Sequence, residues 1–309
     1  MSKRGILSPI NQQNVKSSSI QVPLVLRDDK GENFPHNGTE CSLKTTDFFN
    51  THPVFSLNEA ARILAPAGGR SGAVERLKYH LKAGRLKLVT RGVYAVVPPG
   101  VPTEGFQPDP FLAAAAVRPD GIFSHHSALE LLGAAHSVWN RYTLYVEQRR
   151  RPLRVNNTDI RFLEHPGPMR AAPCQKLGLR RVEYRGKLLQ TTGPERTLVE
   201  GFRRLAEVGG LQELINSASG FAVLDLGLLQ EILQCYSIAN LWAATGWFLE
   251  RFRQSFHVTE RVLDRMGQHC PRAPQYLERN RRDGVFAARW NLLLPKGLVN
   301  LEEPDERES

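Results

Sequence analysis

Apolar and polar positions alternate most regularly between residues 54 and 97. Apolar residues first recur at spacings of three and four, which predicts a helix with one buried face. Ser56 and Glu59 have the spacing of a capping box, in which each side chain accepts a hydrogen bond from an otherwise unpaired amide of the first turn. We therefore expect a helix that begins at Ser56, ends before the Pro66–Gly69 break, and is buried through Leu57, Ala60, Ala61 and Leu64.

A second helix is expected from Ser71, which would cap it, to Ala83, because Gly84 suits the left-handed residue that often ends a helix. Its outer face would carry small side chains at the N-terminal end of the helix and cationic, hydrogen-bonding side chains after them. Such a face suits the major groove of DNA, although an ordinary amphipathic helix with a solvated face is the alternative. The inward set is Ala73, Val74, Leu77 and Leu81, and the outward set is Gly72, Glu75, Arg76, Tyr79 and Lys82.

Two β-rich runs, 86–89 and 93–97, follow the second helix and are separated by a short turn. Gly92 in this turn supplies the positive φ that a tight hairpin needs. Helix, turn, helix and hairpin in this order are typical of a winged helix-turn-helix, whose wing lies along the phosphate backbone or inserts an Arg into the minor groove. The residues expected to contact DNA are Arg70, Ser71, Gly72, Glu75, Arg76, Tyr79, Lys82, Lys87, Thr90 and Arg91.

The chain as a whole is predicted to fall into five segments. Residues 1–43 are polar and without a sustained period, which predicts a disordered arm. The winged helix-turn-helix would take residues 44–98, and the Pro-rich stretch 99–109 would be a stiff linker. A larger mixed α/β domain is expected over 110–296, followed by an acidic tail over 297–309. The predicted fold class is α+β, with a helical C-terminal half to the larger domain.

The first half of the larger domain is predicted to supply its sheet. A helix over 111–117 precedes a short strand that enters a helix within 121–133. The strands after it show alternating apolar residues bounded by turn signals, at 142–147, 160–165, 180–184 and 187–191. A basic run between the first two of these strands is expected in an exposed loop and offers possible phosphate contacts: Arg149, Arg150 and Arg151.

From Thr192 onward the chain is predicted to be helical. Thr192 and Glu195 again have capping-box spacing, and we expect Arg196 to be buried or bridging rather than catalytic. A last strand over 289–294 is expected to return to the sheet. The helices expected in this half are 194–207, 211–218, 225–236, 238–256, 260–266 and 274–279.

Charge and cysteine content narrow the class of protein. The 309 residues carry a formal net charge of +10, which favours a polyanionic partner; the alternative is a basic soluble protein that binds no polyanion. The four cysteines form no CxxC pair, so we expect reduced thiols and no zinc site. No apolar run has the length of a membrane span, and the first residues lack a signal-peptide core, so we expect a cytoplasmic protein.

No group of residues in the sequence predicts an enzyme. His125 and His126 with their neighbouring serines form the densest reactive group, but helix caps and a packed histidine are the better interpretation. The sequence contains no nucleophile elbow, P-loop or dinucleotide-binding turn. A nuclease would need clustered carboxylates, whereas Asp159 and Glu164 fall on opposite faces of a strand. We therefore expect no catalytic residue, no metal and no cofactor.

Five motifs, in this order, resemble the AbiEi-type antitoxins of abortive-infection (type IV) toxin–antitoxin systems, a form of phage defence. The resemblance covers about residues 47–296. The chain departs from the family in having Glu200 where an Asp is expected, and in its longer N-terminal arm. The motifs are RGVYAV (91–96), FSHHSALELLG (123–133), TGPERTLVE (192–200), GWFLE (246–250) and WNLLLP (290–295).

The resemblance implies a transcriptional repressor with a second role. Its N-terminal domain would bind inverted repeats in the promoter of its own operon. Its α/β domain would counteract a nucleotidyltransferase-like toxin without forming a stable complex with it. One alternative is a stand-alone winged-helix regulator whose C-terminal domain binds a ligand or another subunit. A DNA nuclease is the third hypothesis, and plasmid DNA that stays intact with magnesium or manganese would exclude it.

Overall fold

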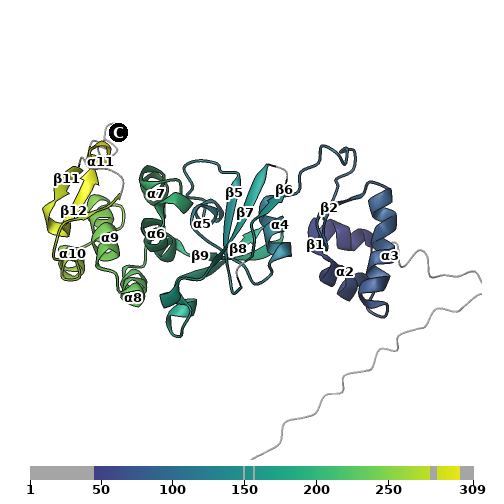
Figure 1. The fold of residues 1–309 in the computed structure, drawn as a ribbon, viewed down its shortest axis with the longest axis horizontal. Helices are drawn as coiled ribbons and strands as arrows, with labels where there is room; N and C mark the ends of the chain where they lie inside the picture. Colours follow the sequence, from purple (N-terminus) through teal and green to yellow (C-terminus); the bar gives the residue numbers. More distant parts are fainter. Residues whose placement is uncertain (1–44, 149, 156, 279–283, 300–309) are drawn as a thin grey trace, which may run out of the picture. The chain divides into compact units, whose positions relative to one another are not determined.

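The computed structural model describes residues 45–148, 150–155, 157–278 and 284–299. All of them belong to one compact unit, which begins at Leu43. The expected arm over 1–43, Arg149 and most of the expected acidic tail lie outside the described residues. In the described residues, three sheets and a larger number of helices make up a mixed α+β fold (Figure 1).

The first part of the fold contains two helices and a hairpin, as the hydrophobic pattern predicts. A helical turn over 45–51 precedes them. The hairpin strands pair antiparallel, and a short strand before the helices, which the sequence did not predict, adds to the hairpin in the order β1-β3-β2. The elements are β1 (Val54–Ser56), α2 (Leu57–Leu64), α3 (Gly69–Lys82), β2 (Leu86–Thr90) and β3 (Val93–Val96).

Local sequence signals explain where these helices begin and end. The capping box is confirmed: the Ser56 hydroxyl accepts from the Glu59 amide at 3.2 Å, and the Glu59 carboxylate accepts from the Ser56 amide at 2.7 Å. Gly84 adopts the expected positive φ of 69° at the end of α3. Ser71 as the cap of α3 is wrong, because Gly68 and Gly69 turn the chain and the helix starts two residues earlier.

The Pro-rich segment after the hairpin folds back on it. The Lys87 ammonium donates to the carbonyl of Phe106 at 2.6 Å and lies 3.4 Å from that of Glu104. The Thr103 hydroxyl donates to the carbonyl of Gly84 at 3.0 Å. Hydrogen bonds therefore hold residues 103–106 against β2 and the end of α3.

The second sheet has six strands in the order β6-β7-β5-β4-β9-β8. Strands β5 and β7 run parallel, as do β4 and β9, and the other neighbours are antiparallel. The four strands predicted between 142 and 191 are confirmed, and β6 was not predicted. Two helices and six strands fall in this part: α4 (Pro110–Val117), β4 (Ile122–Phe123), α5 (His126–Leu131), β5 (Arg141–Val146), β6 (Leu153–Val155), β7 (Thr158–Glu164), β8 (Leu179–Tyr184) and β9 (Lys187–Thr192).

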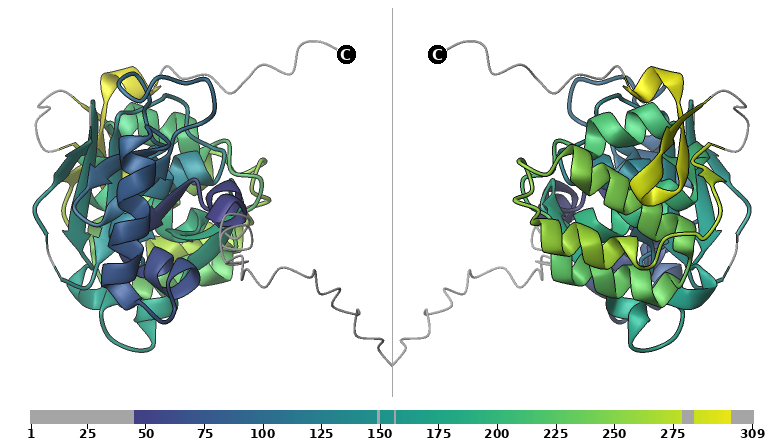
Figure 2. Two further views of the ribbon diagram at one scale, coloured as in Figure 1. Left: turned by 90° about the vertical axis from the view of Figure 1, so that its right-hand side faces the viewer. Right: turned by 90° about the vertical axis from the view of Figure 1, so that its left-hand side faces the viewer.

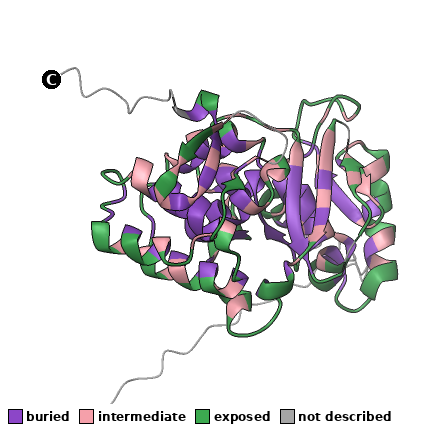
Figure 3. Ribbon diagram, turned by 60° about the vertical axis from the view of Figure 1, so that its left-hand side comes forward, coloured by how far each residue is buried: buried purple, intermediate pink, exposed green. Residues whose placement is uncertain are grey.

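Helix α4 lies between the two sheets. On one side, its Phe111 packs with Leu144 and Ile160 of the six-stranded sheet. On the other side, its Leu112 packs with Val54 and neighbouring residues of β1 and β3. Side chains alternate between the faces of a strand, so Tyr145 of β5 points away from α4, toward the helices on the opposite face. The central strands β4 and β5 of this sheet are largely buried, as the purple strand in Figure 3 shows, whereas the edge strands β6 and β8 have no fully buried residue.

The C-terminal half is helical and ends in a third, small sheet. The strand order of this sheet is β10-β12-β11. Short 3₁₀ turns occur in this half at Leu205–Glu207 and Ala288–Trp290, and between β7 and β8 at Gly167–Met169 and Cys174–Lys176. The right view of Figure 2 shows this sheet in yellow beside the green helices. The elements are α6 (Pro194–Arg203), α7 (Leu211–Ala218), α8 (Leu226–Tyr236), α9 (Ala239–Arg251), α10 (Glu260–Gly267), β10 (Gln275–Tyr276), β11 (Gly284–Ala287), β12 (Leu292–Pro295) and α11 (Lys296–Val299).

Two sequence predictions for this half are wrong. The predicted helix 274–279 is not formed over its described residues 274–278, since Gln275 and Tyr276 pair with β12 as a strand. The final strand does not return to the six-stranded sheet. The fully buried Trp290 attaches this segment to α9 instead, against Gly246, where any Cβ would overlap the indole ring.

The prediction that all cysteines are reduced thiols is also wrong. Cys174 and Cys235 form a disulfide, with a sequence separation of 61 positions and 6.1 Å between their Cα atoms. Sequence spacing gave no sign of this pair, because only the packing of α8 beneath the 166–178 loop brings the two residues together. Within the described residues, no helix is both long and apolar enough to cross a bilayer.

Candidate nucleic-acid interface

Helix α3 presents the side chains that the sequence assigns to its outer face. Ala73 and Leu77 are buried, whereas Arg76, Tyr79 and Lys82 are exposed, with Tyr79 at 64%. The left view of Figure 2 looks onto this side of the molecule, and no other described element covers α3 there. The helical periodicity of the sequence therefore predicted which side of α3 is buried and which is exposed, except at Gly72.

The N-terminal turn of α3 differs in detail from the prediction. Arg70 and Ser71 are exposed in the first turn. Gly72 is half-buried, and a Cβ built on it would lie 3.4 Å from the Cβ of Ala65. The small size of Gly72 thus allows the close approach of α3 to the end of α2.

One predicted contact residue already has a partner on its own helix. The Glu75 carboxylate lies 2.6 Å from the ammonium of Lys78, one turn later, and both side chains are largely exposed. An exposed pair of this kind contributes little stability and opens easily. The Lys78 ammonium nevertheless neutralises the charge of Glu75, the one acidic residue in the outward set. The surface around Arg76 and Lys82 therefore remains basic.

The hairpin differs from the prediction in how it uses its two cationic residues. Arg91 is exposed in the turn, next to Gly92 with its confirmed positive φ of 78°. Thr90 is half-buried at the edge of β2, beside an irregularity in the strand register. Lys87 is half-buried and holds the 103–106 segment, so Arg91 is the better placed of the two for a phosphate contact.

The predicted contact residues leave out two further cations on this surface. Lys78 is exposed on the flank of α3, and Arg85 is exposed just after it. A count of cations on and beside the helix would have found both. The basic run in the larger domain divides differently: Arg150 and Arg151 are exposed, while Arg149 lies outside the described residues.

The histidine pair is built into the core, in agreement with its structural interpretation. Burial lowers the pKa of the fully buried His125 to about 4, so its ring is neutral at physiological pH. Its Nδ1 atom lies 3.0 Å from the Ser124 hydroxyl. His126 stacks on Trp139 at 4.6 Å and lies 2.9 Å from the Glu130 carboxylate. The predicted serine caps are wrong, because α5 begins after His125 and no side chain caps it.

Arg196 is buried and bridging, as predicted. Its Nε atom donates to Glu200 at 2.8 Å, and its Nη1 atom donates to the carbonyls of Gln175 and Leu177. The capping box expected before it is wrong: Gly193 is the cap of α6, and the buried Glu195 accepts from the amide of Asp225 instead. Among the described residues, no three His, Cys, Asp or Glu side chains are placed to hold a metal ion.

Comparison with known proteins supports the fold and does not identify a family. No protein-family model matches the chain, and no curated protein sequence matches it. The chain is similar to the crystal structure of the RV2827C protein from Mycobacterium tuberculosis, with a TM-score of 0.53 and 15% sequence identity. The match covers 82% of this chain and 91% of that one. At this level of identity the similarity concerns the fold alone.

Proposed function

We propose that residues 44–98 form a winged helix-turn-helix that binds double-stranded DNA. The observation that carries the proposal is the exposed outer face of α3, on which Arg76, Tyr79 and Lys82 share one side. A helix of this kind fits the major groove, where arginine, tyrosine and lysine side chains reach base edges and phosphates. Arg91, in the turn of the adjoining hairpin, would contact the backbone or the minor groove.

The biological role we propose is that of an antitoxin and autorepressor of the AbiEi type. The protein would bind inverted repeats in its own promoter, and the larger domain would counteract a nucleotidyltransferase-like toxin. Support comes from the order of the five motifs behind the helix pair. Four of these motifs occupy core positions: FSHHSALELLG in β4 and α5, TGPERTLVE at the start of α6, GWFLE in α9, and WNLLLP around the buried Trp290.

Two experiments test the two halves of this proposal separately. Fluorescence anisotropy with the DNA upstream of the reading frame tests repressor binding, with scrambled DNA of equal length as the control. Co-expression with the neighbouring reading frame tests the antitoxin role. Rescue of growth supports it, and persistent toxicity beside normal DNA binding would favour the stand-alone regulator.

A further inference from the structure

The larger domain contains a cavity of about 510 Å³ between β7 and the end of α6. Its volume lies within the range of small-molecule sites, roughly 300–1,000 Å³, and is too small to admit a DNA duplex. Its lining contains one carboxylate, that of Glu164. Five arginines line the same cavity: Arg150, Arg161, Arg170, Arg203 and Arg204.

Only part of this positive charge is balanced by the protein. Arg170 pairs with Glu164 at 2.8 Å, and Arg161 lies 3.6 Å from Glu207. The guanidinium groups of Arg150, Arg203 and Arg204 have no carboxylate within ion-pair distance among the residues that the structure describes. Unbalanced like charges around a cavity repel one another, and a bound anion would relieve that repulsion.

The end of α6 brings two of these arginines to one site. Neighbouring residues on a helix point about 100° apart. Arg203 is the last residue of α6, and Arg204 leaves helical geometry with φ −139° and ψ 69°, so both side chains line the same cavity. The guanidinium of Arg203 also lies over the ring of Tyr236, 5.8 Å from its centroid, which helps to orient it.

His165 adds a neutral hydrogen-bonding group to the wall of the cavity. Its ring stacks on Tyr145, with centroids 5.2 Å apart, and its buried Nδ1 atom has no hydrogen-bond partner among the described residues. Burial and then the charge of Arg196 lower the pKa of His165, so the ring is neutral near pH 7. A neutral imidazole can donate one hydrogen bond to an oxyanion.

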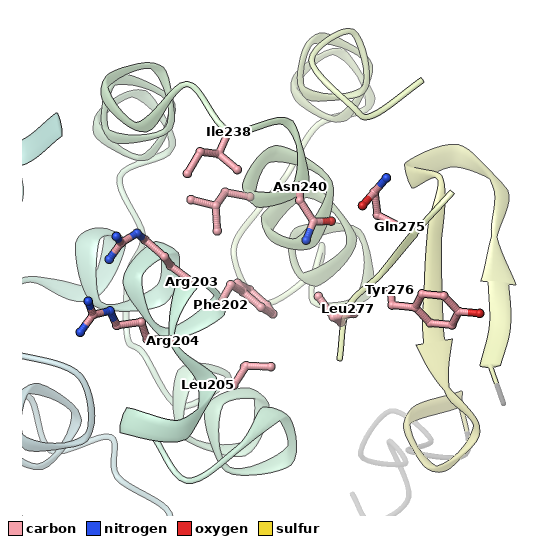
Figure 4. Close-up of a pocket in the computed structure, with 10 residues that line it drawn as sticks. Phe202, Arg203, Arg204, Leu205, Ile238, Asn240, Gln275, Tyr276 and Leu277 are labelled. Carbon is pink, nitrogen blue, oxygen red and sulfur yellow. The ribbon is translucent and has the colours of Figure 1, made fainter. Parts of the chain in front are cut away.

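A second cavity, of about 710 Å³, shares the same arginine pair. Figure 4 shows Arg203 and Arg204 on one side of it, Asn240 and Gln275 on the other, and apolar side chains such as Phe202 and Leu277 between them. The Oδ1 atom of Asn240 is buried and has no hydrogen-bond partner within the described part of the chain. The apolar wall and the amide groups suit a flat polar ring, and the two guanidinium groups opposite them suit phosphates. A ligand that joins such a ring to phosphates would fit this arrangement.

We propose that the two cavities bind one nucleoside phosphate. Its phosphoryl groups would lie among the arginines of the smaller cavity, and its nucleoside would lie against Phe202 and Asn240 in the larger one. Guanidinium groups bind phosphate oxygens through charge-assisted and often bidentate hydrogen bonds, which makes arginine the suitable residue type. This proposal is independent of the DNA-binding role, because no residue of α3 or the hairpin lines either cavity.

Isothermal titration calorimetry of the full chain at physiological salt tests the proposal. ATP should bind measurably, inorganic triphosphate more weakly, and adenosine not detectably. The double variant Arg203→Gln/Arg204→Gln should weaken ATP binding by about a hundredfold or more, since each of the two lost charge-assisted hydrogen bonds carries a factor of about ten or more. Arg150→Gln, in an exposed segment remote from the core, should weaken it in the same direction. Arg261→Gln, on the exposed face of α10, is the matched control and should bind ATP as the wild type does.

The outcomes separate the parts of the proposal. Absence of ATP binding, or equal binding by the wild type and the Arg203/Arg204 variant, would overturn it. Triphosphate binding as tight as that of ATP would overturn the placement of the nucleoside. Asn240→Ala should weaken the binding of ATP and leave that of triphosphate unchanged. An Arg76→Ala/Tyr79→Ala variant should retain ATP binding, whatever its effect on DNA.

Discussion

Lys187 of β9 reaches the first helix pair and lies 3.4 Å from the carboxylate of Glu59, the same residue that closes the capping box of α2. The Lys187 ammonium also donates to the carbonyl of Val54 at 3.0 Å. Together with α4, this contact ties the proposed DNA-binding segment to the six-stranded sheet. A structural change in β9 of the larger domain can therefore affect the N-terminus of α2 directly, through Lys187.

Replacing Lys187 with Met should lower the free energy of unfolding by about 1 kcal/mol, because the Val54 carbonyl and Glu59 each lose a charged partner. Hydrogen exchange should increase at the amides of β1 and α2. Urea denaturation and exchange mass spectrometry measure the two effects. Lys176→Met, at an exposed position, is the control. Hydrogen exchange in β1 and α2 that is the same in Lys187→Met and the wild type would show that Lys187 does not stabilise these two elements.

Glu59 gives this contact a pH dependence. Burial opposes ionisation of Glu59, but hydrogen bonds from Ser56 and the charge of Lys187 outweigh it and lower its pKa below 4.5. A carboxyl group with a lowered pKa stabilises the fold above its unfolded pKa, and this contribution is lost as the pH falls through the folded value. The stability difference between wild type and Glu59→Gln should therefore be largest at pH 6–7 and shrink below about pH 4.5. Urea denaturation across this pH range should show the unfolding free energies of the two proteins converging as the pH falls. A difference that stays constant with pH would rule out a contribution from the lowered pKa of Glu59.

The buried pair Arg196–Glu200 makes a different prediction. Both side chains are essentially inaccessible, so removing one partner leaves an uncompensated buried charge and should cost about 3–5 kcal/mol. The double variant Arg196→Met/Glu200→Leu should be less destabilised than the sum of its two singles. A double-mutant cycle by urea denaturation measures the coupling. Additive effects would show that the two residues do not act as a pair.

The disulfide should contribute to stability under oxidising conditions. Closing the loop between Cys174 and Cys235 restricts the unfolded chain, so Cys235→Ser should lower the unfolding free energy by about 2–4 kcal/mol. The same variant should make stability insensitive to added reductant. Peptide mapping of unreduced protein should recover the two linked peptides, and their absence would restore the original expectation of free thiols.

Much of the local structure followed from sequence because it depends on short-range physics. The Ser56–Glu59 box, the positive φ of Gly84 and Gly92, and the two faces of α3 are set by residues a few positions apart. The prediction of serine caps on α5 was wrong because a tertiary contact uses the serine side chain. The Ser127 hydroxyl accepts a hydrogen bond from the amide of Thr143 on β5 instead. The third sheet and the disulfide depend on contacts between distant segments, which no local pattern encodes.

The same distinction between local and long-range contacts decides which candidate site residues could be predicted from the sequence. The cations of α3 and the hairpin are neighbours in sequence, so periodicity could place them. The arginines of the cavity come from three separate segments, of which only the one with Arg150 drew attention as a basic run. For Lys87, the edge position predicts a phosphate contact, whereas the hydrogen bond from its ammonium to the carbonyl of Phe106 depends on a residue 19 positions away and could not be predicted from the local pattern.

The two parts of the proposed DNA-binding surface should respond differently to substitution. Arg76→Ala or Tyr79→Ala should cost about 1–3 kcal/mol of binding and relax sequence preference, because these side chains would read bases. Arg91→Ala should weaken binding to every sequence and reduce the slope of log affinity against log salt by about 1, as one phosphate contact is lost. Salt titrations on specific and scrambled DNA distinguish the two patterns, and identical behaviour of all three variants would contradict this division.

The central claim is that α3 and its hairpin bind the promoter of the protein's own operon. A gel-shift titration of the wild type and of Arg76→Ala/Tyr79→Ala/Arg91→Ala on DNA from upstream of the reading frame tests it most directly, with Arg265→Ala on α10 as control. The account predicts that the wild type and the control form a specific complex, and that the triple variant loses at least about a hundredfold in affinity. Equal affinity of the triple variant and the wild type for this DNA would contradict it.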